Sequence, residues 1–248
     1  MYFIYDNAGF TEATIVDGAY SSSFSASSTI DNEERINDQS ILTEITSYVG
    51  TDAIRIDFGE AVSVDAIALY MNATENDDIV LASSDDGTTN AGIVSTISST
   101  FNANQWKIVT FSEETHRYFV LTQGTGSATF TGLTEVILGK KLTFEYAPDI
   151  GINESYKYGS KNKTSLGGVE YAVKTHEPIN SYKLKFSNIS STFKSNLQDV
   201  ESAVQTHKKF LWNNDSATKY VRLTDSIKYT EISYQRYSAS LQLREQLT

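Results

Sequence analysis

The side chains of this sequence that are best suited to proton transfer or metal binding are three histidines and a few pairs of acidic residues. His116, His176 and His207 lie far apart and form no His-Glu-x-x-His or His-x-His pattern, so a histidine metal site has no local support. Each is better explained as a structural residue. Asp85 and Asp86 are weak metal candidates, because carboxylate oxygens are the ligands that calcium prefers.

Turn formation explains this acidic pair better. In Ser84-Asp85-Asp86-Gly87, the Asp oxygen can bond to the backbone while Gly87 takes a positive φ angle. The sequence has no cysteine, which excludes disulfides, thiolate zinc sites, iron–sulfur clusters and a cysteine nucleophile. It also has no nucleophile-elbow, Walker or dinucleotide motif. We therefore expect a protein that is not an enzyme and that carries no cofactor and no metal.

Two tryptophans are the aromatic residues that could stack on sugar rings. Trp106 begins an alternating segment, and Trp212 stands at the end of a segment with helical spacing. Burial in a core, or against a neighbouring subunit, is the better explanation for both.

Charge divides the chain into two parts. Residues 1–141 hold 20 acidic and 6 basic residues, whereas residues 142–248 hold 11 acidic and 14 basic residues. A shift of this size indicates a domain boundary. The acidic part is unsuited to nucleic acid, and the second part lacks the dense Lys and Arg patches that duplex binding needs.

The first part has the pattern of short strands joined by polar turns. Residues 54–58 and 62–70 alternate between apolar and polar positions, with a turn at Gly59-Glu60 and a phase slip near Asp65-Ala66 that indicates a bulge. Similar short segments, with no helical pattern between them, predict an antiparallel sandwich or jelly roll. These segments are residues 79–81, 93–97, 106–111, 117–122 and 135–138.

Five segments of residues 10–140 stand in an order that is typical of one known family. They are Ala53 to Gly59, Ser84 to Gly87, Trp106 to Val109, His116 to Leu121 and Leu133 to Gly139. On these segments the chain resembles the discoidin-like (coagulation factor 5/8 C-type) galactose-binding sandwich. The resemblance implies a jelly-roll domain over residues 1–141 and a host glycan as a possible partner. The chain lacks the paired cysteines of the extracellular members, which suits a protein assembled inside a cell.

In the second part, residues 142–248, apolar and polar residues alternate over 142–146 and 182–186. Between these two segments, the stretch from Tyr158 to Gly168 is rich in Gly, Ser, Lys and Asn, and it predicts a mobile loop. A helix is predicted over about 191–212, with a cap at Ser190 or Ser191. Strands are predicted again from Tyr220 to Leu247. The apolar positions that define the helix are Phe193, Leu197, Val200, Val204 and Leu211.

The second part therefore has strands, then a helix, then terminal strands, and it ends in the alternating segment Ile232 to Glu245. This order resembles the tail-tube fold of bacteriophage tails, in particular distal-tail or minor tail proteins. The resemblance implies a β-sandwich with a flanking helix that forms a hexameric ring at the distal end of the tail, with tube and hub proteins as partners and DNA passing through without specific binding. It implies a subunit interface that includes Tyr234, Tyr237, Leu241 and Leu243.

We therefore expect a virion structural protein located in the tail and assembled in the host cytoplasm. The first residues show no signal-peptide pattern, and no apolar stretch approaches the ~20 residues of a membrane span, so no membrane partner is expected. The alternative is a carbohydrate-binding module that contacts host-surface glycans. A polysaccharide-degrading enzyme has the least support.

Overall fold

The structure, a computed structural model, describes residues 1–7, 9–20, 24–26, 30–47, 52–74, 78–88, 92–97, 101–123, 130, 132–149, 152–168 and 170–246. Strands dominate this part of the chain, and α1 (Ser191–Val204) is the one α-helix that it contains. The prediction of a mainly β fold with one flanking helix is therefore confirmed.

The chain divides into two compact units. The first unit is Ile4–Leu142, and the second unit combines Met1–Phe3 with Thr143–Leu247. The charge shift predicted a division between residues 141 and 142 and placed Met1–Phe3 in the first part. In the structure these three residues belong to the second unit, so the chain passes from one unit to the other twice.

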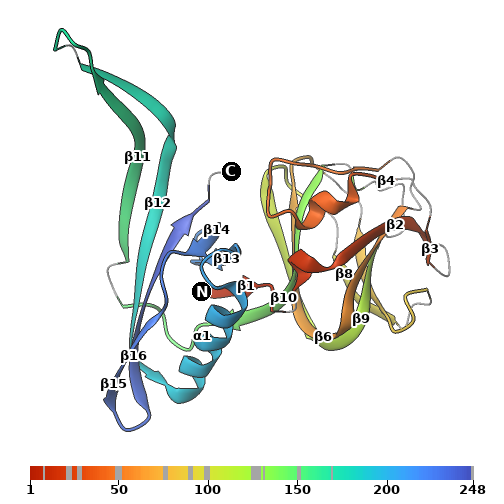
Figure 1. The fold of residues 1–248 in the computed structure, drawn as a ribbon. Coiled ribbons are helices and arrows are strands. Elements are labelled where there is room, and N and C mark those ends of the chain that lie inside the picture. The colour runs from red at the N-terminus through yellow and green to blue at the C-terminus, as the bar shows by residue number, and fades with distance from the viewer. Residues whose placement is uncertain are drawn as a thin grey trace. The chain divides into compact units, whose positions relative to one another are not determined.

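The first unit contains a strongly twisted antiparallel sheet (Figure 1). Its strand order is β1-β10-β6-β9-β7-β8, in which β1 contributes Ile4 and Tyr5 to this unit, and β2 pairs with both β3 and β6. Two short strands, β4 and β5, pair separately. The strands are β1 (Tyr2–Tyr5), β2 (Thr14–Tyr20), β3 (Phe24–Ala26), β4 (Ile30–Asp31), β5 (Thr46–Ser47), β6 (Asp52–Met71), β7 (Ile79–Ser84), β8 (Gly92–Ile97), β9 (Gln105–Gln123) and β10 (Leu133–Thr143), with 3-10 turns at Phe10–Glu12 and Glu33–Asn37.

The long strand β6 explains the phase slip in the sequence. Its register with β9 shifts between Val64 and Ala66, where the sequence predicted a bulge, so this prediction is confirmed. The Gly59-Glu60 turn does not separate two strands. It lies inside β6, where the register is irregular between Asp57 and Val62 and Gly59 has a φ of 79°. A glycine tolerates this angle without the steric cost that a side chain would add.

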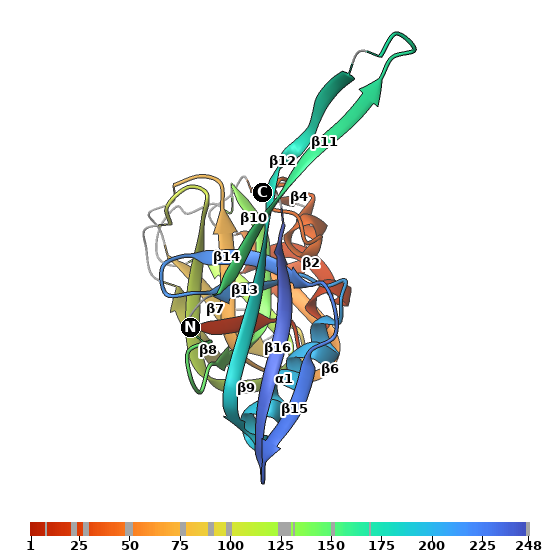
Figure 2. The ribbon, with the colours of Figure 1, turned by 90° about the vertical axis from the view of Figure 1, so that its left-hand side faces the viewer.

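The second unit contains a sheet in the order β11-β12-β16-β14-β13-β1, with β15 also paired to β16 (Figure 2). Its strands are β11 (Asn153–Thr164), β12 (Glu170–Ser190), β13 (Phe210–Asn213), β14 (Thr218–Leu223), β15 (Lys228–Ser233) and β16 (Arg236–Glu245). Along β16, Ala239, Leu241 and Leu243 are buried, whereas the alternate positions are not, as the alternation predicted.

Helix α1 covers one face of this sheet. The Ser190 hydroxyl accepts a hydrogen bond from the Phe193 amide at 3.0 Å, which satisfies one of the free N–H groups at the start of the helix. The predicted stripe of Phe193, Leu197, Val200 and Val204 is buried, and the helix contacts β12, β14 and β16.

The predicted end of this helix at residue 212 is wrong. The helix ends at Val204, and Gln205 has a φ of 48°, which does not continue a right-handed helix. Phe210–Asn213 forms β13, which pairs with β14. Leu211 follows Val204 by seven residues, so it fitted the helical spacing by coincidence, and tertiary strand pairing decided the structure.

The predicted mobile loop from Tyr158 to Gly168 is also wrong. Residues 153–164 pair with β12 in a long antiparallel hairpin, and the turn is confined to the tip, where the Gly168 amide bonds to the Ser165 carbonyl at 2.9 Å. The polar composition that indicated a loop belongs to the outer part of β11, which is exposed on both faces, and to the tip of the hairpin.

Candidate functional site

The outer part of the β11–β12 hairpin, residues 157–178, extends beyond the rest of the second unit (Figures 1 and 2). We call this segment the arm. Almost all of its described side chains are exposed, so it has no core of its own. A two-stranded hairpin of this kind is marginally stable in water unless something packs against it.

Large apolar side chains lie on the arm in spite of this exposure. Tyr158 is 71% exposed, Tyr171 is 55% exposed and Val173 is 58% exposed, while Leu166 at the tip is fully exposed. Tyr156, at the base of the arm, is also exposed. Tyr171 and Val173 are alternate residues of one strand, and a patch of exposed apolar side chains marks a surface that another molecule covers.

The strand register gives the arm two different faces. Lys163 lies opposite Tyr171, and Lys161 lies opposite Val173. Because alternate residues of a strand share a face, these four residues form one face, which we call the Lys–Tyr face. Ser160 and Asn162 lie on the opposite, more polar face.

A second unpaired element lies at the other end of the same unit (Figure 1). Within the described residues, strand β15 pairs with β16 on one side and has no strand partner at its other edge. Ile232 on this strand is 53% exposed, and Tyr234 in the following turn is 86% exposed. Of the predicted interface residues, Tyr234 is therefore available to a partner and Tyr237 is partly so. Leu241 and Leu243 are buried within the unit itself.

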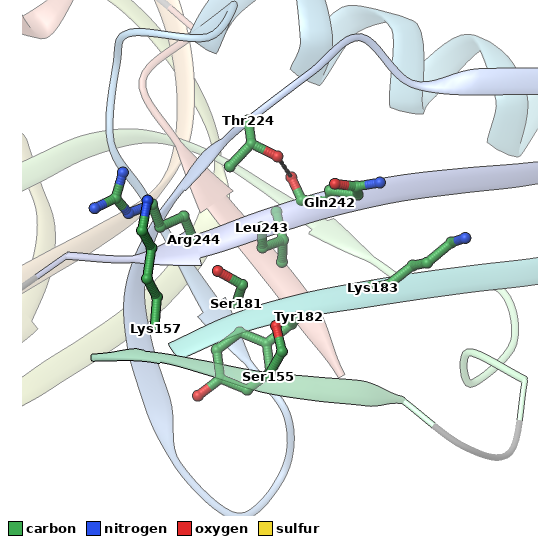
Figure 3. A pocket seen from close by; sticks show the side chains of 9 residues that line it. All are labelled: Ser155, Lys157, Ser181, Tyr182, Lys183, Thr224, Gln242, Leu243 and Arg244. Carbon is green, nitrogen blue, oxygen red and sulfur yellow. Dashed lines mark hydrogen bonds between the residues drawn. The ribbon is translucent and has the colours of Figure 1, made fainter. Parts of the chain in front are cut away.

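A pocket of about 480 Å³ lies on the sheet near the base of the arm (Figure 3). Strand β11 contributes Ser155 and Lys157, and the other residues come from β12, β16 and the turn after β14. Among the described residues, its lining is mostly polar and basic and includes no carboxylate side chain. The remaining lining residues are Ser181, Tyr182, Lys183, Thr224, Gln242, Leu243 and Arg244.

Tyr182 anchors the floor of this pocket to the core. Its ring packs edge-on against Trp212 with centroids 5.0 Å apart, and its hydroxyl donates to Glu245 Oε2 at 2.8 Å. Lys219 donates to the same hydroxyl at 2.6 Å. Burial and the Glu245 carboxylate raise the pKa of Tyr182 well above its usual range, so this residue stays neutral. It fixes the pocket and does not titrate in it.

No pattern in the sequence indicated this pocket. Residues 182–186 alternate in the sequence, but this pattern gave no sign that Lys157 and Arg244 lie on the two strands next to the one that carries Lys183. Pairing of β11, β12 and β16 brings them together across long sequence separations.

The predicted acidic turn of the first unit is a turn in the structure. The Asp86 carboxylate accepts from the Thr88 amide at 2.8 Å, and Gly87 has a φ of 74°. Asp85 lies 2.7 Å from Nδ1 of His116. Among the described residues, no group of three or more His, Cys, Asp or Glu side chains could hold a metal ion.

Next to this turn lies a polar–aromatic cluster. Arg117 donates two hydrogen bonds to Asp57, at 2.8 and 3.0 Å. Both Arg117 and Arg55 lie over the ring of Tyr118, at 4.7 and 5.6 Å from its centroid. The hydrogen bonds from Arg117 hold the pKa of the Asp57 carboxyl below its usual range, so the carboxylate is ionised at neutral pH.

The two tryptophans and the other two histidines that the sequence offered as candidates lie apart from one another. Trp106 packs edge-on against Tyr70 at 5.2 Å, whereas Trp212 is fully buried and lies on β13 rather than on a helix. His176 contacts the carbonyl of Glu177 at 2.6 Å, and His207 is exposed in the turn after α1. The structure does not bring these residues together into a site.

Comparison with known proteins gives similarity only at the level of structure. No family model matches the chain, and no curated protein matches it. Solved structures similar to it include chitosan-binding module 1 of a chitosanase/glucanase from Paenibacillus sp. IK-5 (20% identity, 54% of this chain and 97% of that chain, TM-score 0.38). Others are a CBM32 module from a family 31 glycoside hydrolase of Clostridium perfringens (18%, 51% and 94%, TM-score 0.39) and the family 32 module of C. perfringens NanJ in complex with galactose (16%, 57% and 100%, TM-score 0.39).

These TM-scores are all below 0.5, so no function is transferred from these modules to the chain. None of the three is a phage tail protein, and the resemblance to tail-tube proteins therefore stays a prediction. Within the described residues, no helix has the length and apolar character that crossing a membrane requires.

Proposed function

We propose that this chain is a non-enzymatic structural protein of a tailed-phage virion, which forms a ring at the distal end of the tail tube through its second unit. The observation that carries the proposal is the arm, a two-stranded hairpin with exposed Tyr and Val side chains and no core of its own. Such an element is completed by contact with another molecule.

A second copy of the chain fits the arm best. The arm and the free edge of β15 lie at opposite ends of one unit, and both carry exposed aromatic and aliphatic side chains. Contact between two different surfaces of identical subunits is heterologous, and it closes into a ring when the rotation between copies divides a full turn. The expected hexamer is one such ring.

The arm is tested by changing only its Lys–Tyr face. We expect the full chain to be oligomeric and the double variant Tyr171→Ser/Val173→Ser to be largely monomeric in size-exclusion chromatography with light scattering. Each of these side chains contributes roughly 1.5–3 kcal/mol when it is fully buried, and a loss of about 1.4 kcal/mol corresponds to tenfold weaker association.

The matched control is Ser160→Ala/Asn162→Ala, which changes the opposite face of the same arm. This variant should assemble as the unchanged chain does, and circular dichroism should show the same fold for all three proteins. A monomeric wild-type chain, or an oligomer that persists in the Tyr171→Ser/Val173→Ser variant, would overturn the proposal.

Glycan binding by the first unit is the second candidate function. The observation that favours it is the polar–aromatic cluster, in which guanidinium groups, a carboxylate and the half-buried Tyr118 ring meet. Sugars are bound by such combinations of an apolar face and a few fixed polar groups.

A glycan array tests this second function. If the cluster is the site, the wild-type chain binds a defined subset of glycans, and Tyr118→Ala loses that binding. Tyr234→Ala changes an exposed tyrosine of the other unit and should bind normally. Binding that survives Tyr118→Ala would exclude the cluster as the site.

A further inference from the structure

The pocket near the base of the arm concentrates positive charge. Lys157, Lys183 and Arg244 line it, and they come from three neighbouring strands of one sheet. The other side chains that surround them include the hydroxyls of Ser155, Ser181 and Thr224 and the amide of Gln242. Hydroxyl and amide groups can donate hydrogen bonds to the same anion that the cations attract.

The strand register adds a fourth cation beside this pocket. Arg222 on β14 lies directly opposite Arg244 on β16. Like charges directly opposite each other destabilise an antiparallel pair. In addition, the Arg222 Nε atom is buried and has no hydrogen-bond partner among the described residues. The sheet itself does not compensate this charge, so an external anion is the natural counterpart.

These cations also lack carboxylate partners in the part of the chain that the structure describes. Among the residues that the structure describes, Lys157, Lys183, Arg222 and Arg244 form no ion pair with Asp or Glu. Lys219, on the other side of the same sheet, differs in this respect because it lies 3.7 Å from Glu245. A simple solubilising surface would mix both signs of charge, whereas this one is a concave site of a single sign.

We propose that this pocket binds carboxylate side chains from the acidic part of a second copy of the chain. Residues 1–141 hold 20 acidic residues against 6 basic ones, so a neighbouring copy offers many carboxylates. Lys157 lies on β11, the strand that continues into the arm, so a copy engaged by the arm is held next to the pocket. The inference therefore rests on the proposed self-assembly and names a second contact within it.

A charge reversal at Lys183 tests this contact. Lys183 is exposed, so Lys183→Glu leaves the core intact. We expect its self-association, measured by sedimentation velocity at low salt, to be about tenfold weaker or more, because a close charge pair between proteins is replaced by repulsion. Association of the wild-type chain should weaken as sodium chloride is added, since salt screens such contacts.

Two control variants separate charge position from net charge. Lys208→Glu makes the same change of charge in the turn after α1, away from the pocket lining, and should associate as the wild type does. Lys183→Arg keeps the cation and should also associate normally. If Lys208→Glu weakened association as much as Lys183→Glu, net charge alone would explain the result and the pocket would not be the contact.

Other outcomes distinguish the pocket from the arm. If Tyr171→Ser/Val173→Ser dissociates while Lys183→Glu assembles like the wild type, the pocket inference fails and the proposed function stands. If the wild-type chain is monomeric, both fail. Inorganic phosphate should weaken wild-type association more than sodium chloride of equal ionic strength. Phosphate that binds the pocket without affecting association would indicate a site for a free oxyanion and overturn the assignment to a second copy.

Discussion

Replacing Gly139 by alanine is expected to lower the free energy of unfolding of the first unit by roughly 3 kcal/mol, the upper part of the usual range for an overpacked interior. Gly139 lies in β10 and pairs with Ala66 of β6. A Cβ atom at this position would lie 2.1 Å from the carbonyl oxygen of Tyr5. The clash is with backbone, so no side-chain rotation relieves it, and a strand has to move.

Gly92→Ala is the matched control for this prediction. Gly92 is exposed on β8 in the same unit, and a Cβ atom there would have no neighbour within 4 Å. Urea unfolding followed by circular dichroism should therefore give a midpoint close to that of the wild type for Gly92→Ala and a clearly lower one for Gly139→Ala. Equal midpoints for the two variants would show that β1 does not approach β10 this closely.

Gly139 also illustrates what the sequence could and could not predict about the fold. The alternation of residues 54–58 and 62–70 predicted two short strands and the bulge near Asp65-Ala66, because side-chain periodicity is a local property, but it did not predict that both segments form the one long strand β6. The close approach of Tyr5 to Gly139 is not local. It depends on β1 lying beside β10 across more than half of the chain, and no periodicity records that pairing.

Two predictions for the second unit were wrong for a related reason: the loop over residues 158–168 and the end of the helix at residue 212. Residues 158–168 are rich in Gly, Ser, Lys and Asn, a composition that usually forms loops because it buries little apolar surface. In the arm the same composition forms strands, and the paired backbone of β12 supports it. Leu211 matched a helical spacing and Trp212 was expected at the end of that helix, yet pairing with β14 placed both in a strand. Tertiary contacts overrode local pattern at both places.

The interface residues that the sequence indicated stay a prediction, although the structure shows which of them are accessible. The terminal strand indicated Tyr234 and Tyr237 as interface residues together with Leu241 and Leu243, and burial removes the last two from an accessible surface. The sequence did not reveal the Lys–Tyr face of the arm or the basic pocket. Both depend on which residues face one another across strands, as Lys161 and Val173 do, and that register is fixed only in the folded sheet.

Replacing Trp212 by alanine is expected to lower the free energy of unfolding of the second unit by about 3–5 kcal/mol, the usual range for a large aromatic residue deleted from a core. Trp212 is fully buried and is the largest such side chain in the described part of the molecule. The substitution also removes the indole ring that packs against the Tyr182 ring, with the two ring centroids 5.0 Å apart. Since Tyr182 lines the basic pocket, self-association should weaken together with stability.

Two comparisons make this prediction specific. The Trp212 Nε1 atom has no hydrogen-bond partner among the described residues, so Trp212→Phe removes volume but no hydrogen bond and should lose less stability than Trp212→Ala. Trp106→Ala removes a half-buried ring of the first unit and should leave assembly unchanged. Urea unfolding by circular dichroism gives the stabilities and light scattering gives the oligomer. If Trp212→Ala were no more destabilising than Trp106→Ala, β13 would not form the core next to the pocket.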